Sequence, residues 1–476
     1  MNAPFDPSAI AAAAVQQMET GDGPLVLAPA VPLESARQLI RRRYTETGVQ
    51  TLHHQQATFF GWSGTHYREI DREEMRACIY EFLEKARRLN DDKLVPFNPT
   101  RNKVGDVLDA LAAAAQLPGT VRPPAWLGDA PHPAATDILA CSNTLVHLPS
   151  RAVLAHTPAF YGVNAVEYPY DSSARKPKAW LAFLASIWPA DQASIDTLQE
   201  LFGLVLTGDT SQQKAFLIVG PKRSGKGTIA RVLTAMLGQD NVAGPTLSSL
   251  TQNFGLAPLI GKPLAIVSDA RLGGRADANV IVERLLAITG EDAISVDRKF
   301  RDTWTGRLPT RFVVMTNEMP RLADASGALA SRFIVLALTQ SFYGREDAAL
   351  TGKLIAELPG ILNWAIDGRQ RLYARGYFVQ PHSAVQAVEE LADLASPIGA
   401  FIRDRCVVGT HHGVECDKLY AAWAAWCADQ HRDHPGNVQS FGRDLRAAVP
   451  GLGITQPRDA ATGERFRYYQ GVGLAQ

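Results

Sequence analysis

The chain has 476 residues, of which 46% are hydrophobic and 20% are charged. Lys plus Arg and Asp plus Glu each number 48, so no global basic excess indicates a nucleic-acid partner, and any DNA contact must come from a local surface. The length is too great for one hydrophobic core and predicts about three domains. The five cysteines form no C-x-x-C pair, as expected for free thiols in a reducing cytoplasm. No basic leader and no long apolar stretch is present, so we expect a cytoplasmic protein that does not span a membrane.

The N-terminal part is expected to hold a flexible tail, residues 1–25, and an accessory region, residues 26–135. Within the accessory region, apolar residues at helical spacing predict a helix over 33–43 and an amphipathic helix over 72–89. The first of these helices ends in three consecutive arginines, which complement the negative end of the helix dipole. A structural role for this basic cluster is therefore favoured over a DNA contact.

A connector rich in Pro and Gly, residues 117–136, leads into a mixed helical and β region at residues 136–205. Short runs typical of strands follow the connector, the last of them at 165–170. Two amphipathic helices are predicted over 178–206, directly before the central part of the chain.

The central stretch, from Ala215 to Arg231, has the pattern of a buried strand, a glycine-bounded loop and a helix. Such a loop exposes successive backbone N–H groups, the helix start adds the positive end of its dipole, and Lys226 can reach β- and γ-phosphates. We predict that the following residues bind a nucleotide: Gly220, Pro221, Lys222, Arg223, Ser224, Gly225, Lys226, Gly227 and Thr228. Gly227 stands where Ser or Thr usually binds Mg²⁺, so either Thr228 or water supplies that oxygen.

Apolar strands and helices continue to alternate beyond this loop. Strands are predicted at 264–269, 311–318 and 333–338, with a helix over 277–289 between the first two. This alternation predicts an α/β fold with a mainly parallel sheet, whose carboxyl edge holds the ligand. We assign the core to residues 206–345 and a helical lid or linker to residues 346–395, where the helical pattern of 350–372 is placed to cover the nucleotide.

Three polar residues in this core suit the hydrolysis of a nucleoside triphosphate, which needs Mg²⁺, a polarised water and positive charge on the transition state. Asp269 ends a predicted strand and is the candidate for the metal and water side. Asn317 ends the next core strand, where its amide can hydrogen-bond the attacking water or the γ-phosphate. Arg332 heads the last strand and suits an arginine finger that reaches a neighbouring subunit's nucleotide. Each signal alone is weak, but together, in order and on one sheet edge, they favour a nucleotide-hydrolysing ring.

Between Asp269 and Asn317, residues 294–300 read as a short hairpin with a basic and aromatic tip. In a ring, such a tip can face the central channel, where Arg298 and Lys299 meet DNA phosphates and Phe300 stacks on bases. An alternative with equal support is that these residues form a solvated loop whose two positive charges do not contact DNA.

The C-terminal stretch, residues 396–476, has the layout of a winged helix. We predict helices over 418–429 and 441–448, followed by a hairpin whose second run is 465–469. The arginines placed to contact DNA there are Arg443, Arg446, Arg465 and Arg467. Acidic residues lie between them, so docking of a protein is nearly as well supported. The cysteines and histidines of this stretch have spacings that match no standard zinc site.

The ordered segments GPKRSGKGT, LAIVSDARL, GEDAISVDRKF, VVMTNEMP and ALASRF resemble the superfamily 3 helicase domain, an AAA+ type. More closely, they resemble the primase–helicases of phages, plasmids and poxviruses, over residues 136–380. The resemblance implies a P-loop AAA+ core with ATP and Mg²⁺ as cofactors and six subunits in a ring. By residue, it implies that Lys226 and Thr228 bind phosphate and Mg²⁺ and that Asp269 is the remaining acid of the Walker B strand. It further implies that Asn317 is the sensor, Arg332 the finger and Lys299 the DNA contact in the channel.

Two positions depart from this family pattern. Ser268 precedes Asp269 where the family often has paired acids, and Gly227 replaces the residue that carries the Mg²⁺ hydroxyl. Residues 1–135 show no paired acids with a histidine that would form a primase site, so we expect a helicase without a primase domain.

The sequence thus predicts a ring-forming, ATP-dependent helicase that acts on single-stranded or forked DNA in the replication of a phage, plasmid or integrated element. A separate primase or replication protein is a candidate partner. A DNA-binding assembly module with little motor activity is the alternative, and a nucleotide kinase is less favoured.

Overall fold

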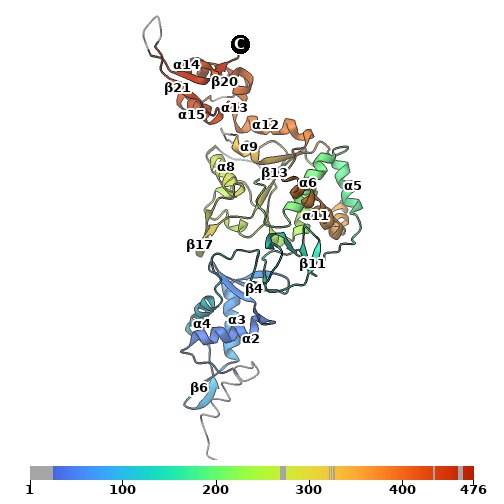
Figure 1. Ribbon diagram of the computed structural model, residues 1–476, viewed down its shortest axis with the longest axis vertical. Helices are drawn as coiled ribbons and strands as arrows, with labels where there is room; N and C mark the ends of the chain where they lie inside the picture. The colour runs from blue at the N-terminus through green and yellow to red at the C-terminus, as the bar shows by residue number, and fades with distance from the viewer. Residues whose placement is uncertain are drawn as a thin grey trace, which may run out of the picture. The chain divides into compact units, whose positions relative to one another are not determined.

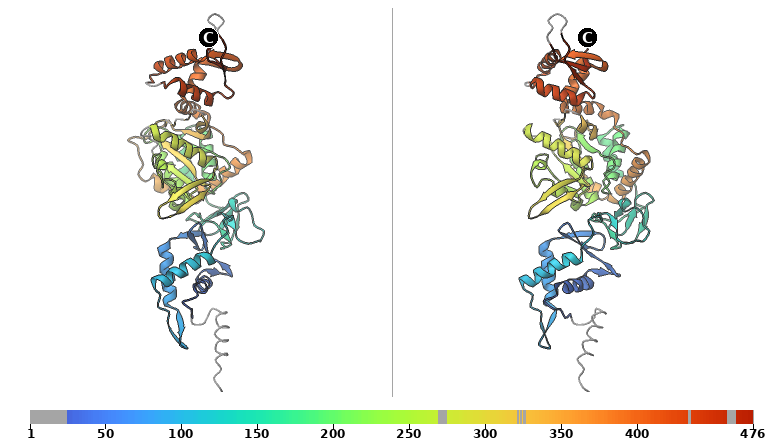
Figure 2. Two further views of the ribbon diagram at one scale, coloured as in Figure 1. Left: turned by 90° about the vertical axis from the view of Figure 1, so that its left-hand side faces the viewer. Right: turned by 60° about the vertical axis from the view of Figure 1, so that its left-hand side comes forward.

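The computed structural model describes residues 25–268, 275–320, 322, 324, 327–432, 435–458 and 465–475 (Figures 1 and 2). The described residues divide into two compact units, one running to Tyr170 and including Phe300–Trp304, the other holding the rest of the chain. In the described part of the chain, no helix combines the length and the apolar character needed to cross a lipid bilayer.

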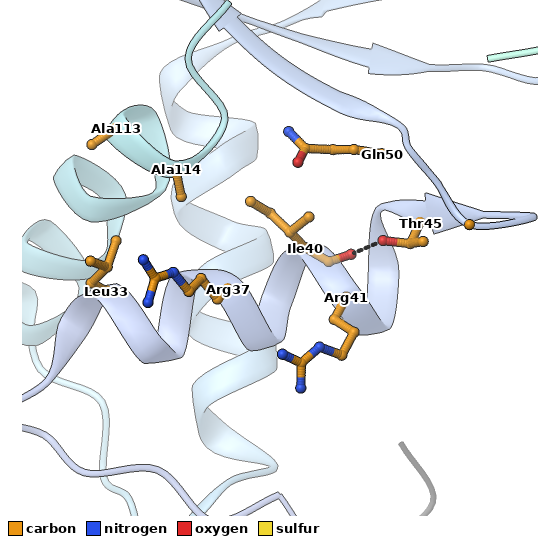
Figure 3. A pocket seen from close by; sticks show the side chains of 9 residues that line it. Leu33, Arg37, Ile40, Arg41, Thr45, Gln50, Ala113 and Ala114 are labelled. Carbon is orange, nitrogen blue, oxygen red and sulfur yellow. Dashed lines mark hydrogen bonds between the residues drawn. The ribbon is translucent and has the colours of Figure 1, made fainter. Parts of the chain in front are cut away.

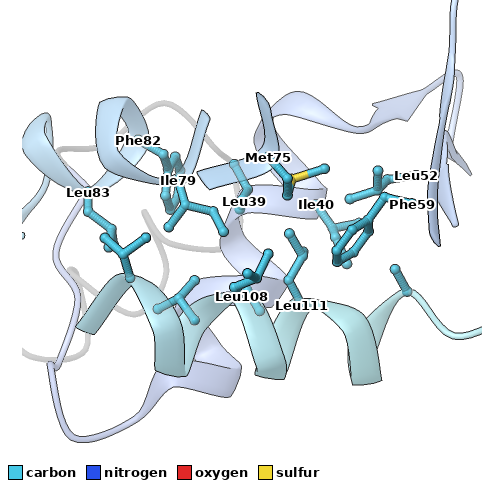
Figure 4. Packing of buried hydrophobic residues seen from close by; sticks show 14 of the residues in the cluster. Leu39, Ile40, Leu52, Phe59, Met75, Ile79, Phe82, Leu83, Leu108 and Leu111 are labelled. Atoms are coloured by element: carbon cyan, nitrogen blue, oxygen red, sulfur yellow. The ribbon is translucent and has the colours of Figure 1, made fainter. Parts of the chain in front are cut away.

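From residue 25 on, where the structure describes it, the N-terminal unit is built from three helices and small antiparallel sheets. The helices are α2 (Pro32–Arg43), α3 (Arg72–Glu84) and α4 (Arg101–Ala114). Their apolar faces meet in one cluster, where Leu39, Ile79 and Leu111 are fully buried (Figure 4). The strands of this unit are β1 (Thr45–Glu46), β2 (Val49–Gln50), β3 (Leu52–Gln55), β4 (Thr58–Trp62), β5 (Tyr67–Ile70), β6 (Arg87–Asn90), β7 (Lys93–Pro96), β8 (Ala125–Trp126), β9 (Ile138–Ala140), β10 (Leu145–His147), β11 (Ala152–Leu154) and β12 (Phe160–Tyr161).

Two sequence predictions in this unit are wrong. The helix predicted over 72–89 ends at Glu84, because the chain turns back in the antiparallel hairpin of β6 and β7. Asp91 and Asp92 form its turn with positive φ values of 46° and 61°, which Asp tolerates better than most residues. The run at 165–170 forms no strand. Helix α4 was not predicted.

The larger unit is organised around a five-stranded parallel sheet in the order β14-β15-β18-β13-β19. Its strands are β13 (Ala215–Val219), β14 (Val242–Ala243), β15 (Leu264–Val267), β18 (Arg311–Thr316) and β19 (Phe333–Ala337). The apolar side chains of β15 and β18 are buried throughout, as expected for a parallel sheet covered on both faces. The prediction of a mainly parallel α/β sheet is confirmed.

The helices of this unit up to Arg375 are α5 (Lys178–Ile187), α6 (Gln192–Leu204), α7 (Lys226–Leu237), α8 (Arg275–Thr289), α9 (Ala328–Arg332), α10 (Leu350–Ile355) and α11 (Leu358–Arg375). Figure 1 shows α5, α6 and α11 gathered on one side of β13 and α8 on the other. The pattern predicted as one helix over 350–372 is two helices, because Pro359 occupies the first turn of α11 and cannot sit in a helix interior.

Helices α6 and α11 approach each other through glycines. A Cβ at Gly203 would collide with the Ala365 carbonyl oxygen, and one at Gly368 would collide with the Gln199 carbonyl oxygen. Beside this contact, the buried carboxylate of Glu200 on α6, only 2% exposed, binds two arginines of α11. Its distances are 2.7 Å to Nε of Arg371 and 2.5 Å to Nη2 of Arg375.

The C-terminal part has its own apolar core, around Phe401, Leu419, Leu445 and Val472. Its elements are α12 (Val385–Ala395), α13 (Pro397–Arg405), β20 (Cys406–Glu415), α14 (Cys416–Asp429), α15 (Val438–Ala448), β21 (Gly453–Thr455) and β22 (Tyr468–Leu474). The three strands form an antiparallel sheet in the order β20-β22-β21. The remaining strands, β16 (Ile294–Arg298) and β17 (Arg301–Gly306), form the predicted hairpin.

Candidate functional site

The predicted phosphate loop lies between β13 and α7, and its two outer glycines are sterically required. A Cβ at Gly220 would lie 2.6 Å from the carbonyl oxygen of Leu338, the residue that follows β19. Gly225 is the N-cap of α7 with a left-handed φ of 98°, and a Cβ there would lie 3.1 Å from the Phe183 ring. The room at Gly220 is therefore taken by the neighbouring strand rather than left for an anion.

The polar groups of this loop are arranged for an anion. The ammonium of Lys226 donates to the carbonyl oxygens of Gly220 at 2.7 Å and Pro221 at 2.8 Å, and to the Ser224 hydroxyl at 3.1 Å. In the described part of the chain, the backbone N–H groups of residues 222–225 donate to no acceptor. A loop whose carbonyls are satisfied and whose N–H groups are open has a positive concave side that suits phosphate. Partial burial lowers the pKa of Lys226 from its ordinary value.

The first turn of α7 carries the candidate oxygen for Mg²⁺. The Thr228 hydroxyl accepts a hydrogen bond from Nη2 of Arg231 at 3.2 Å, one turn further along the helix. At Gly227, a Cβ would meet only Nη1 of Arg231, at 3.4 Å, so packing does not demand glycine there. Thr228 thus offers a hard oxygen donor at the loop, of the kind Mg²⁺ prefers, and its role as ligand stays a prediction.

The carboxyl ends of the central strands lie level with the loop. Val219, the last residue of β13, pairs with Thr316 at the end of β18 and with Ala337 at the end of β19. Asn317 follows Thr316 and is exposed, so it lies at the same edge of the sheet as the phosphate loop. Asp269 lies outside the described residues, which end in this segment at Ser268, one residue after β15.

Arg332 lies at the amino-terminal ends of the strands, opposite the phosphate loop, so the prediction that it shares one sheet edge with Asn317 is wrong. It ends α9 directly before β19, whose first residue, Phe333, pairs with Ala215 at the start of β13. Its half-buried guanidinium donates to Oε1 of Gln213 at 3.1 Å and to the Thr289 carbonyl at 3.3 Å. The length of a five-residue strand, about 16 Å, therefore separates Arg332 from the phosphate loop of its own chain.

The predicted DNA-contacting residues occupy separate elements. Arg298 ends β16, and Phe300 in the following turn is 93% exposed with a φ of 59°. In the C-terminal part, Arg443 and Arg446 lie on α15, whereas Arg465 and Arg467 precede β22, and all four are exposed. Nε of Arg443 lies 3.1 Å from an Asp444 carboxylate oxygen. The described residues contain no cluster of three or more His, Cys, Asp or Glu side chains arranged for a metal, and His434 lies outside them.

An open pocket of about 590 Å³ lies in the N-terminal unit (Figure 3). Arg37 and Arg41 of α2 line it together with apolar side chains such as Leu33 and Ile40. None of the predicted site residues lines this pocket. The neighbouring Arg43 binds Glu81 of α3 at 3.0 Å, which gives part of the basic cluster the structural role favoured from the sequence.

Sequence reasoning missed the residues that surround the phosphate loop. Arg231 touches Thr228, and Ser341 and Phe342 hydrogen-bond the loop backbone. Of these residues, only Arg231 could have been found from the sequence, because it stands three residues after Thr228 and so lies on the same face of the helix.

Comparison with known proteins finds a matching family and a similar fold. Residues 218–332 match a family described as a family of unknown function, DUF5906. An apo structure of the C-terminal region of NrS-1, residues 305–718, has a TM-score of 0.51 with 10% sequence identity, covering 93% of this chain and 99% of that one. A second apo structure of the same region, the A form, has a TM-score of 0.49 with 10% identity, over 93% of this chain and 100% of that one. The first likeness shows that the two chains share a fold.

Proposed function

We propose that this protein is an ATP-dependent, ring-forming DNA helicase that acts in the replication of a phage, plasmid or integrated element. The observation that carries the proposal is the phosphate loop itself: open backbone N–H groups, a half-buried lysine inside the loop, and the amide of Asn317 at the same sheet edge. The motif order that resembles superfamily 3 helicases supports the P-loop AAA+ reading of this core. The three-stranded antiparallel sheet that shares a core with α14 and α15 supports the winged-helix reading of the C-terminal part.

The chain's own residues supply binding and charge. The loop N–H groups and the start of α7 hold the phosphates, and Lys226 exchanges its carbonyl partners for phosphate oxygens, which accept more strongly because they are charged. Asn317 orients the attacking water. Thr228 and Asp269 would hold Mg²⁺, which neutralises charge that develops on the phosphates when it is bound.

Arg332 completes the site of a neighbouring copy rather than its own. Its place at the far edge of the sheet requires head-to-tail contacts, and such contacts close into a ring when the rotation allows it. We take six subunits from the family resemblance. The hairpin tip with Arg298, Lys299 and Phe300 then faces the DNA in the channel, and the arginines of the C-terminal part contact duplex DNA or a partner such as a separate primase.

A DNA-binding assembly module with little motor activity is the second candidate, because it would use the same phosphate loop. We place either protein in the cytoplasm of a bacterial host. A nucleotide kinase is less favoured, because the phosphate loop lies past residue 215 and is followed by a core strand that leads to Asn317.

The deciding experiment measures ATP hydrolysis with and without single-stranded DNA and the separation of a forked duplex, for wild type and Lys226→Ala. Lys85→Ala serves as the control, because that lysine is an exposed ion-pair residue of the N-terminal unit. The helicase predicts DNA-stimulated hydrolysis and strand separation in wild type and control, and neither in Lys226→Ala. Slow hydrolysis that DNA does not change would favour the assembly module, and transfer of phosphate to a nucleoside monophosphate would favour the kinase.

A further inference from the structure

The segment that follows β19 is fastened along the outer side of the phosphate loop. The Leu338 N–H donates to the Val219 carbonyl at 2.8 Å. Three residues on, the Ser341 hydroxyl donates to the Lys222 carbonyl at 2.9 Å, and the Phe342 N–H donates to the Arg223 carbonyl at 2.9 Å. These bonds occupy loop carbonyls and leave the loop N–H groups for a ligand.

The chain that continues from this segment also contacts α7. Glu346 pairs with Arg223 at 3.3 Å before the chain enters α10. On α10, the Thr351 hydroxyl accepts from Nε of Arg231 at 3.1 Å, while Nη2 of the same guanidinium binds Thr228. Residues 341–351 therefore border the loop from its outer arm to the residues that begin α7.

Within this bordering segment, one aromatic ring is turned outward. Tyr343 is 80% exposed, although the residue before it is bonded to the loop and the next, Gly344, makes a turn with a φ of 76°. Arg345 folds back over the Phe342 ring, 5.6 Å from its centroid, and donates to the Ser341 carbonyl at 3.0 Å. The backbone of the turn is thus held in place, and the exposed Tyr343 ring directly follows a residue that is bonded to the loop.

We propose that residues 341–351 form the nucleoside side of the site and that the Tyr343 ring stacks on the base of a bound nucleoside triphosphate. The proposal rests on the phosphate loop holding the triphosphate, as proposed above. We place the base of a nucleotide held there over this segment, because residues 341–351 border the loop from Lys222 to the Arg231 side chain of α7. An aromatic ring stacks on any base because every base has a π face, so the site discriminates weakly among bases.

The test compares ATP with inorganic tripolyphosphate, which has the same phosphate chain and no base. Equilibrium binding of both is measured for wild type, Tyr343→Ala, Tyr343→Trp and Lys226→Ala. Tyr377→Ala is the control, since Tyr377 is an exposed tyrosine, at 61%, that has no contact with the loop. We expect Tyr343→Ala to weaken ATP about tenfold, as loss of one base–aromatic stack predicts, and to leave tripolyphosphate unchanged. Tyr343→Trp and Tyr377→Ala should bind both as wild type does.

Each contrary outcome has a distinct meaning. Unchanged ATP binding by Tyr343→Ala, in a protein whose Lys226→Ala variant loses both ligands, overturns the stacking proposal and leaves the phosphate site standing. Equal weakening of ATP and tripolyphosphate by Tyr343→Ala also overturns it, because the ring would then act through the shape of the loop. A wild type that binds neither ligand overturns the phosphate site and the stacking proposal together.

Discussion

Replacing Arg332 with alanine distinguishes a nucleotide site that one chain builds alone from a site that two neighbouring subunits share. About 16 Å lies between Arg332 and the phosphate loop of its own chain, from the five-residue length of β13 and β19. At that distance a unit charge contributes about 0.3 to 1 kcal/mol for an effective dielectric constant between about 80 and 20, which corresponds to a change of roughly two- to sixfold. An arginine that touches the transition state from a neighbouring subunit instead contributes a factor of about 10³ to 10⁵.

The assay is steady-state ATP hydrolysis by Arg332→Ala at a protein concentration where wild type is assembled. We expect a loss of at least about a thousandfold with ATP affinity retained. Mixing Arg332→Ala with Lys226→Ala should restore part of the activity, because a mixed ring contains interfaces with an intact lysine on one side and an intact arginine on the other. Arg332 also binds Gln213 and the Thr289 carbonyl, so the thermal midpoint is measured alongside to detect a folding defect.

Two results would refute the reasoning. A loss of only a few fold is the size expected within one chain and would remove Arg332 from the catalytic machinery. A large loss in a stably folded, assembled variant that mixing does not rescue would show that the arginine serves its own chain, contrary to its place at the far edge of the sheet.

Three further changes test other parts of the molecule. Gly368→Ala should lower the free energy of unfolding by about 1 to 3 kcal/mol or more, because its Cβ collides with the Gln199 carbonyl. The measurement is denaturant unfolding, with Gly352→Ala as the control because a Cβ there meets nothing within 4 Å. Equal stability of the two variants would contradict the prediction. Burial lowers the pKa of His53 from 6.5 to about 4. The N-terminal unit should therefore keep its full stability above about pH 6.5 and lose up to about 3 kcal/mol as the pH falls towards 4. In urea melts, His53→Leu should flatten this dependence of stability on pH, and an unchanged pH dependence would exclude His53 as its source. Lys299→Ala should keep wild-type ATP affinity and lose DNA stimulation of hydrolysis, and normal unwinding of a forked duplex would remove the hairpin tip from the DNA path.

The strand, loop and helix around Lys226 could be predicted because their signal is local, whereas phosphate binding by the loop stays a prediction. The strand at 215–219 has the predicted bounds, and the helix after it begins at Lys226, within the predicted motif. The position of Asn317 beside the loop followed from the order of apolar strands, since parallel strands bring their carboxyl ends to one edge.

What escaped prediction depends on contacts between distant parts of the chain. The need for glycine at position 220 comes from Leu338, which lies more than a hundred residues away in the sequence. The contact of Thr351 with Arg231 joins two helices that no spacing in the sequence connects. The end of α3 was misplaced because the pairing of β6 with β7 competes with helix formation at residues 87–89.

The tight contact of α6 with α11 determines how short a fragment with the parallel sheet can be and still be expected to fold. One helix precedes the phosphate loop and the other follows the last strand of the sheet, and Glu200 is buried between arginines that only α11 provides. A fragment cut to the family match, residues 218–332, would lack β19 and both helices, and would expose the apolar side chains they cover. Fragments for expression should therefore begin before Lys178 and end after Arg375, and shorter pieces are expected to aggregate.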